Sequence, residues 1–205
     1  MLKNVSTLFS SIVDDLRHKG YSIQKDAIDR QVAIALFQQV SDNTSAKLSQ
    51  AGVGRNGLHT IDTKIRGDYI QWIDASTPAG ESWLAWTDEL RTSINRSLFI
   101  GLEEFESHFA HYPKGAFYQR HKDAFVGESN RVLSLVTYLN PDWQSTDGGE
   151  LVLYRHQEDT EGIKVQPMIG TLVLFLSEEF PHEVLASTRD RYSIAGWFRQ
   201  KSKLI

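Results

Sequence analysis

Residues 171–199 read TLVLFLSEEFPHEVLASTRDRYSIAGWFR. Short runs rich in β-branched and aromatic residues, at 171–176, 182–186 and 191–199, alternate here with residues that are typical of turns. Runs of the same kind precede this stretch, at 105–112, 131–139, 150–155 and 163–166. Many short strands joined by turns predict antiparallel sheets that form a sandwich or a barrel.

The first hundred residues have a different pattern. An amphipathic helix that Gly20 ends is predicted by the helical spacing of Leu8, Ile12, Val13 and Leu16. A second helix is predicted after an N-cap at Asp26, with an inner stripe of Ile28, Val32, Ala35, Leu36 and Val40. We expect a third helix over 81–98, short strands over 21–24 and 68–74, and a loop over 41–60. Helices followed by a run of strands indicate an α+β fold in one compact domain.

Composition limits the function classes. With 205 residues, 40% hydrophobic and 23% charged, the chain has the make-up of a soluble globular protein. Its longest apolar run, at 172–176, is too short to cross a bilayer, and no signal peptide is recognisable, so a cytoplasmic location is expected. The net charge of −4 argues against nucleic-acid binding.

The chain contains no cysteine, which excludes thiolate metal sites and cysteine nucleophiles. A transition-metal site must therefore use His, Asp and Glu, and there are only 7 His to search. In an extended segment, His121 and Asp123 lie on the same side, because side chains alternate. His182 begins a later predicted strand. Two histidines and one carboxylate form the facial triad of non-haem Fe(II) oxygenases.

Several residues of the strand-rich half have both a functional and a simpler structural interpretation. His121 can be a surface or capping histidine, and the same His-x-acid pattern recurs at His156 and Glu158. Arg191 opens the last predicted strand, where its planar guanidinium can bind a carboxylate with two hydrogen bonds or form a weak pair at the strand edge. Tyr138 and Trp197 can be ordinary core aromatics.

Taken together, these residues resemble the Fe(II)- and 2-oxoglutarate-dependent dioxygenases, and within them the prolyl 4-hydroxylases. The resemblance covers most of the chain and is close to the hypoxia-inducible-factor-type prolyl hydroxylases and their bacterial relatives. It rests on segments 112–113, 118–121, 138–143, 148–151, 181–184 and 191–192, and on 65–73 outside the barrel. It implies a double-stranded β-helix (jelly-roll) core over 101–205, with 1–100 as helical support and substrate loop.

The resemblance also implies roles for individual residues. His121, Asp123 and His182 would be the catalytic Fe(II) ligands. Arg191 would bind the distal carboxylate of 2-oxoglutarate with Tyr138, while Tyr112 lines the cosubstrate pocket. Arg131 and Trp197 would face the substrate proline. Molecular oxygen is the other cosubstrate, ascorbate is a candidate cofactor, and the products are succinate and carbon dioxide.

The chain departs from the animal relatives at Ala195, where they carry a threonine, so one hydrogen bond near the cosubstrate is absent. The glycine-containing segment 51–67 is interpreted either as a lid over the substrate or as an ordinary surface loop. A lid of this size suits a protein substrate, and in the bacterial relatives that substrate is a proline of elongation factor Tu. No nucleic acid or membrane is expected as a partner.

Three other functions remain open at this point. The chain can be a hydroxylase of a free amino acid or small metabolite, or it can be non-enzymatic, as a jelly-roll binding module or a metal-storing scaffold. A nucleic-acid demethylase is disfavoured by the acidic balance and by the lack of a basic stripe.

Overall fold

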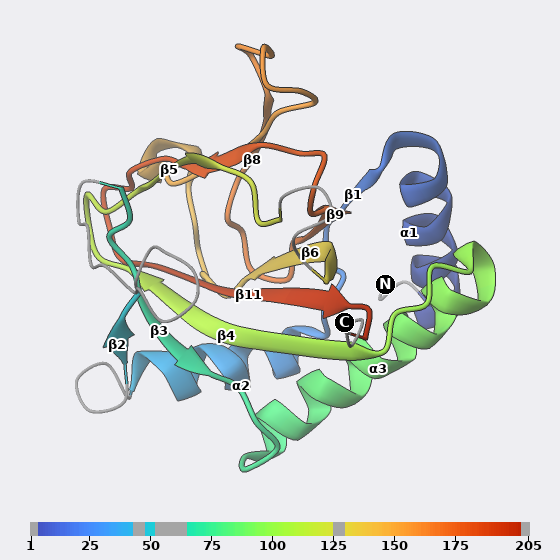
Figure 1. The fold of residues 1–205 in the computed structure, drawn as a ribbon. Helices are drawn as coiled ribbons and strands as arrows, with labels where there is room; N and C mark the ends of the chain where they lie inside the picture. Colours follow the sequence, from blue (N-terminus) through green and yellow to red (C-terminus); the bar gives the residue numbers. More distant parts are fainter. Residues whose placement is uncertain (1–3, 43–47, 52–64, 125–129, 202–205) are drawn as a thin grey trace.

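The structure is a computed structural model that describes residues 4–42, 48–51, 65–124 and 130–201. Figure 1 shows two β-sheets facing each other, with helices against the larger one. The large sheet has seven strands in the order β1-β9-β6-β11-β4-β3-β2, and the small sheet has four in the order β5-β10-β7-β8. Every pairing between these strands is antiparallel. This is the double-stranded β-helix of an α+β protein, as predicted.

The strand bounds agree closely with the predicted runs. The large sheet contains β1 (Tyr21–Gln24), β9 (Leu172–Leu176), β6 (Arg131–Tyr138), β11 (Arg191–Arg199), β4 (Glu104–Tyr112), β3 (Tyr69–Trp72) and β2 (Ser49–Gln50). The small sheet contains β5 (Tyr118–His121), β10 (His182–Val184), β7 (Leu151–Leu153) and β8 (Ile163–Val165). β5 is not among the predicted runs, because a strand reading Tyr-Gln-Arg-His lacks apolar alternation.

Three α-helices cover the outer face of the large sheet: α1 (Val5–Lys19), α2 (Arg30–Ser41) and α3 (Pro78–Leu98) (Figure 1). A short 3₁₀ helix, η1, spans Ser145–Asp147. Alternation along the strands separates two cores. Phe109, Ile194 and Phe198 pack toward the helices, whereas Ala110, Tyr112 and Phe175 face the small sheet. The space between the sheets is therefore where side chains from both sheets meet.

Helix ends follow the capping rules, with one correction. Gly20 ends α1 with a φ of 75°, as predicted. The predicted N-cap at Asp26 is wrong, because Asp26 has a φ of 52° and lies in a turn. Asp29 caps α2 instead, since its side chain accepts from the backbone N–H groups of Gln31 and Val32.

The inner stripe of α2 is also partly corrected. Its buried residues are Ala33, Leu36 and Val40, while Ala35 is only half-buried and Ile28 precedes the helix. Because the helix starts at Arg30, its buried stripe begins later than predicted, at Ala33, and ends at Val40 as predicted. Helix α3 begins at Pro78 rather than at 81, because Thr77-Pro78 is a helix start, with Thr77 as the N-cap and Pro78 in the first turn.

Two expectations stay predictions. The proposed lid at 51–67 lies largely at 52–64, outside the described residues, although β2 crosses the predicted loop at 41–60. The single-domain assignment also stays a prediction.

Among the described residues no helix combines the length and the apolar character that a bilayer crossing requires.

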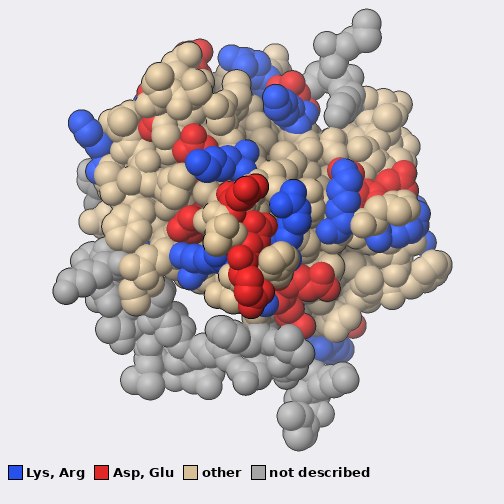
Figure 2. Space-filling view, turned by 90° about the horizontal axis from the view of Figure 1, so that it is seen from above, with Lys and Arg blue, Asp and Glu red and all other residues tan. Residues whose placement is uncertain are grey.

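Charged side chains are mixed on the face seen from above. Figure 2 shows a group of acidic side chains in the middle of that face, flanked by basic ones. A protein that neutralises a row of phosphates presents a continuous positive field instead. The face in Figure 2 carries charges of both signs, and the absence of a nucleic-acid partner stays a prediction.

The corrected helix start gives a first test. Asp29→Ala removes an N-cap and is expected to lower the free energy of unfolding by about 1 kcal/mol. Asp29→Asn keeps a capping oxygen and is expected to retain nearly all of the stability. Urea unfolding followed by circular dichroism measures both. Equal losses in the two variants would contradict the assignment of Asp29 as the cap.

Candidate active site between the two sheets

The two predicted histidines and the aspartate meet inside the molecule. His121 ends β5 and His182 begins β10, and the antiparallel register pairs the two residues directly. Asp123 Oδ1 lies 3.5 Å from His121 Nε2, and Asp123 Oδ2 lies 3.7 Å from His182 Nε2. One ligand atom from each residue falls within 4.8 Å of the others. Two imidazole nitrogens and one carboxylate oxygen suit a first-row ion such as Fe(II).

Hydrogen bonds fix which nitrogen of each imidazole faces this centre. His121 Nδ1 lies 2.8 Å from the carbonyl oxygen of Gln119, and His182 Nδ1 lies 3.2 Å from that of Phe180. Since a carbonyl only accepts, each Nδ1 must donate its proton. Each Nε2 then keeps a free lone pair directed to the shared centre, which is the arrangement that a metal-ligating histidine requires.

The electrostatics favour the metal-binding protonation states. Burial, together with the neighbouring His121, lowers the pKa of His182 to about 4, so its imidazole is neutral at neutral pH. Burial alone would raise the pKa of Asp123. The two histidines and a hydrogen bond from Ser134 outweigh that effect and hold the pKa of Asp123 well below its usual range. The site thus presents a carboxylate and neutral imidazole.

A second group of side chains, Tyr118, Arg66 and Asp68, lies beside His121. The Tyr118 ring stacks on His121 with ring centroids 3.6 Å apart. The Arg66 guanidinium lies 4.9 Å from the centre of the Tyr118 ring and donates to Asp68 at 2.5 and 2.9 Å. Burial opposes the charge on Arg66, but Asp68 outweighs it and raises the pKa of Arg66. This two-bond ion pair links the segment that precedes β3 to His121 through Tyr118.

Arg191 is buried between the sheets, with 1% of its surface exposed, so it is not an exposed strand-edge arginine. Its Nε donates to the carbonyl of Gly149 at 2.9 Å, and its Nη1 donates to Ser193 Oγ at 3.2 Å. Its Nη2 has no hydrogen-bond partner among the described residues, and neither has the buried hydroxyl of Tyr138. Two unpartnered buried donors beside a fixed positive charge fit a carboxylate ligand.

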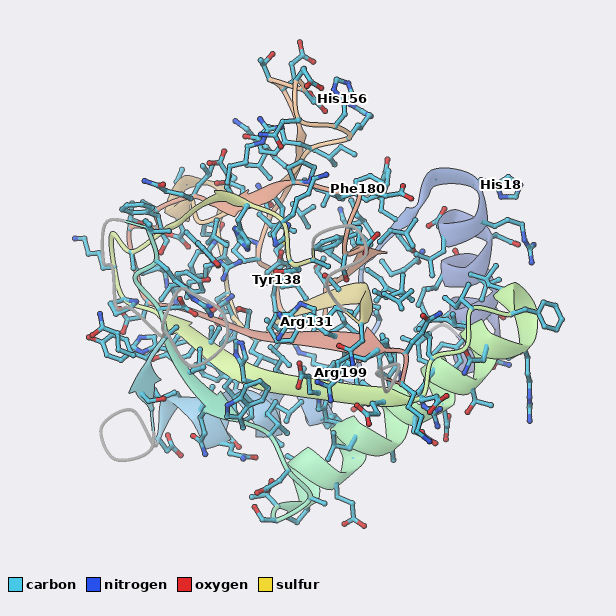
Figure 3. All side chains as sticks on the ribbon, in the orientation of Figure 1. His18, Arg131, Tyr138, His156, Phe180 and Arg199 are labelled. Atoms are coloured by element: carbon cyan, nitrogen blue, oxygen red, sulfur yellow. The ribbon has the colours of Figure 1, made fainter. Side chains whose placement is uncertain are left out.

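The rings of Tyr112 and Tyr138 flank the Arg191 guanidinium. The guanidinium carbon of Arg191 lies 5.1 Å from the centre of each ring. Burial raises the pKa of Tyr138 to about 12, although Arg191 acts in the opposite direction. Tyr138 is therefore a protonated donor at neutral pH. Figure 3 shows it between the two sheets, far from His156 on the projecting loop.

Trp197 and Arg131 pack against each other on the same interior face of the large sheet, next to Ser134. The Arg131 guanidinium lies 3.7 Å over the Trp197 ring and donates to Glu106 Oε1 at 3.1 Å. Trp197 is buried, and its indole Nε1 has no partner among the described residues. The packing continues outward through His108, 5.5 Å from Trp197, to Trp72, which is 55% exposed. An aromatic path thus leads from the interior to the surface.

All of the residues singled out in the sequence therefore lie in or beside one site. The departure at Ala195 is part of it, since Ala195 pairs with His108 and Val136 on the interior face. Further residues contact the predicted ones without having been predicted themselves: Tyr118, Ser134, Gly149, Phe175 and Ser193. Arg66 and Asp68 lie behind Tyr118. In the sequence, Arg66, Asp68, Tyr118 and Gly149 stand out only as part of segments that resemble the family. Nothing in the sequence marks Ser134, Ser193 or Phe175 as site residues, because their role depends on which side chains the folded sheets bring next to them.

The chain is similar in sequence and structure to known oxygenases. The family model of the 2OG-Fe(II) oxygenase superfamily matches residues 107–199. A Pseudomonas putida prolyl-4-hydroxylase structure is 42% identical, covers 94% of this chain and 100% of its own, and has a TM-score of 0.85. A Trichoplax adhaerens prolyl hydroxylase, solved with a fragment of the hypoxia-inducible factor oxygen degradation domain, is 28% identical, with coverages of 96% and 90% and a TM-score of 0.84.

Curated relatives are similar over part of their length. A hypoxia-inducible factor prolyl hydroxylase of Caenorhabditis elegans is 32% identical over 68% of this chain and 20% of its own. Human Egl nine homolog 1 is 29% identical over 91% of this chain and 45% of its own. The chain thus spans less than half of these two relatives.

Metal binding tests the cluster directly. Asp123→Ala removes one ligand and is expected to weaken Mn(II) binding by more than the 10- to 100-fold loss that is typical of an outer-shell partner. The control is Glu158→Ala in the exposed His156-Gln157-Glu158 sequence, which should bind Mn(II) like the parent protein. Electron paramagnetic resonance of free Mn(II) measures both. Unchanged affinity in Asp123→Ala would contradict the assigned centre.

Proposed function

The chain belongs to the 2OG-Fe(II) oxygenase superfamily, and from this we propose that it is a 2-oxoglutarate-dependent prolyl 4-hydroxylase acting on a protein. One observation carries the proposal. A buried arginine with an unfilled donor, Arg191, lies beside the unpartnered hydroxyl of Tyr138 in the same space as the cluster of His121, Asp123 and His182. A metal-storing module has no need of that second, dicarboxylate-sized set of donors.

In this proposal His121, Asp123 and His182 would hold Fe(II), because two histidines and one carboxylate are the ligand set of non-haem Fe(II) oxygenases. With 2-oxoglutarate and oxygen bound, the iron supplies the oxidising chemistry that yields succinate and carbon dioxide and places a hydroxyl group on the proline. The chain's own contribution is to set the ligand geometry. The carbonyls of Gln119 and Phe180 accept from the two Nδ1 atoms and so turn each Nε2 toward the metal position, and Tyr118 stacks on the ring of His121.

Arg191 orients the cosubstrate. Gly149 and Ser193 use two of its donors, so the guanidinium plane is fixed before any ligand binds. The remaining Nη2 and the Tyr138 hydroxyl are left for the distal carboxylate. The buried surroundings strengthen these charge-assisted hydrogen bonds and exclude water.

The substrate proline is proposed to lie against Trp197 and Arg131. The aromatic path through His108 to the exposed Trp72 continues this wall to the surface. A wall of that extent suits a prolyl residue within a longer chain better than a free amino acid. That the relatives include a structure with a hypoxia-inducible factor peptide supports a protein substrate. Elongation factor Tu as the substrate and ascorbate as a cofactor belong to the proposal through the family resemblance alone, and a cytoplasmic location is carried over from the sequence.

Cosubstrate turnover tests the role of Arg191. Arg191→Ala is expected to raise the KM for 2-oxoglutarate by roughly 10- to 150-fold, since a charged hydrogen bond contributes about 1.5–3 kcal/mol. Succinate formation with Fe(II) and oxygen provides the readout. Arg155→Ala, on the exposed loop, is the matched control and should leave the KM unchanged. If Arg191→Ala kept the parental KM, the carboxylate anchor would be wrongly assigned.

Mass spectrometry tests the substrate class. Incubation with elongation factor Tu, or with a bacterial protein extract, is expected to add one oxygen to a proline in a tryptic peptide, and Asp123→Ala should abolish the gain. Hydroxylation of free proline without modification of any protein would favour the small-metabolite alternative. Absence of succinate with every substrate would favour a non-enzymatic module.

A further inference from the structure

We propose that Ser134, supported by Ser177, is a positioning residue that fixes the carboxylate of Asp123 for the metal. The inference deepens the proposed function and rests on it for the identity of the metal. Ser134 lies on β6, opposite Trp197 of β11 and Phe175 of β9, so its side chain is on the face between the sheets. Both serines are buried, with 1% and 0% of their surfaces exposed.

The hydrogen bonds among the three residues have a fixed direction. Ser134 Oγ lies 2.7 Å from Asp123 Oδ2 and 2.8 Å from Ser177 Oγ. A carboxylate accepts and does not donate, so the single hydroxyl proton of Ser134 goes to Asp123. Ser177 must then donate to the oxygen of Ser134. Each bond in such a chain polarises the next and strengthens it, and burial adds to the effect.

Asp123 needs this support more than the histidines do. His121 and His182 lie on paired strands, and their Nδ1 atoms are tied to backbone carbonyls. Asp123 follows the end of β5 and is outside any strand. Apart from the two histidines, Ser134 is its one hydrogen-bonding partner among the described residues. That bond limits rotation of the carboxylate.

The sheet holds the pair of serines in place. Ser177 directly follows β9, and its backbone N–H donates to the carbonyl of Val132 on β6 at 3.0 Å. This bond brings the two hydroxyl groups together. A buried pair of serines that only satisfied each other would not also need a carboxylate within hydrogen-bond distance.

The experiment measures Mn(II) binding without cosubstrate. Ser134→Ala is expected to weaken binding by about 10- to 100-fold, the usual cost of losing an outer-shell partner. Ser177→Ala leaves the bond to Asp123 in place and should cause a smaller loss. Ser134→Thr retains a hydroxyl and should restore most of the affinity. The visible absorption of bound Co(II) should change in Ser134→Ala, because the carboxylate is free to rotate.

Ser107→Ala is the matched control. Ser107 is a buried serine on the helix-facing side of the same sheet, where its hydroxyl accepts from Trp83 Nε1 at 3.1 Å. This variant should lose stability in urea without any change in Mn(II) affinity. Parental affinity and an unchanged Co(II) spectrum in Ser134→Ala would overturn the inference, as would an equal loss of affinity in Ser107→Ala. If Ser134→Ala does not fold, parental affinity in Ser177→Ala overturns it.

The two proposals fail separately. A parent protein that binds Mn(II) but hydroxylates no substrate would count against the proposed function, and the effect of Ser134→Ala on binding would still stand. Hydroxylation by the parent with unchanged metal binding in Ser134→Ala would count only against the positioning role.

Discussion

The antiparallel pairing of β5 with β10 is the constraint on which the site depends. It sets His121 opposite His182 and brings residues that are far apart in the chain to one point between the sheets. Asp123 reaches the same point from the end of β5. A shift of one residue in this register would turn one histidine to the other face and separate the cluster, because strand side chains alternate. Backbone hydrogen bonding therefore fixes where the two histidines lie relative to each other.

One row of cross-strand neighbours in the large sheet lies against the cluster of His121, Asp123 and His182. Glu106, Trp197, Ser134 and Phe175 lie side by side on β4, β11, β6 and β9. Ser134 contacts Asp123, and the Phe175 ring packs against His182 with centroids 4.8 Å apart. Glu106 holds Arg131 over Trp197. A single row thus orients two candidate ligands and the proposed substrate wall together, so a change at one position is expected to affect its neighbours.

Much of the site could be predicted from the sequence because its chemistry depends on residue type. Without cysteine, only His, Asp and Glu could ligate a transition metal, and the resemblance singled out His121, Asp123, His182 and Arg191. Helix and strand periodicity gave the α+β class and most strand bounds. Predictions of helix boundaries failed where two neighbouring residues fit the same role. Asp26 and Asp29 are both acceptable N-caps in sequence, and only the backbone conformation separates them.

By itself the sequence determined the class of fold, the nitrogen and oxygen chemistry of a candidate metal site and the residues that carry the family resemblance. The tertiary structure decided that Arg191 is buried with an unfilled donor, that Ser134 reaches Asp123 and that Arg66 reaches Tyr118. The reason is physical. Periodicity and residue type are local properties, whereas burial and side-chain partners depend on strand register between segments that are distant in the chain.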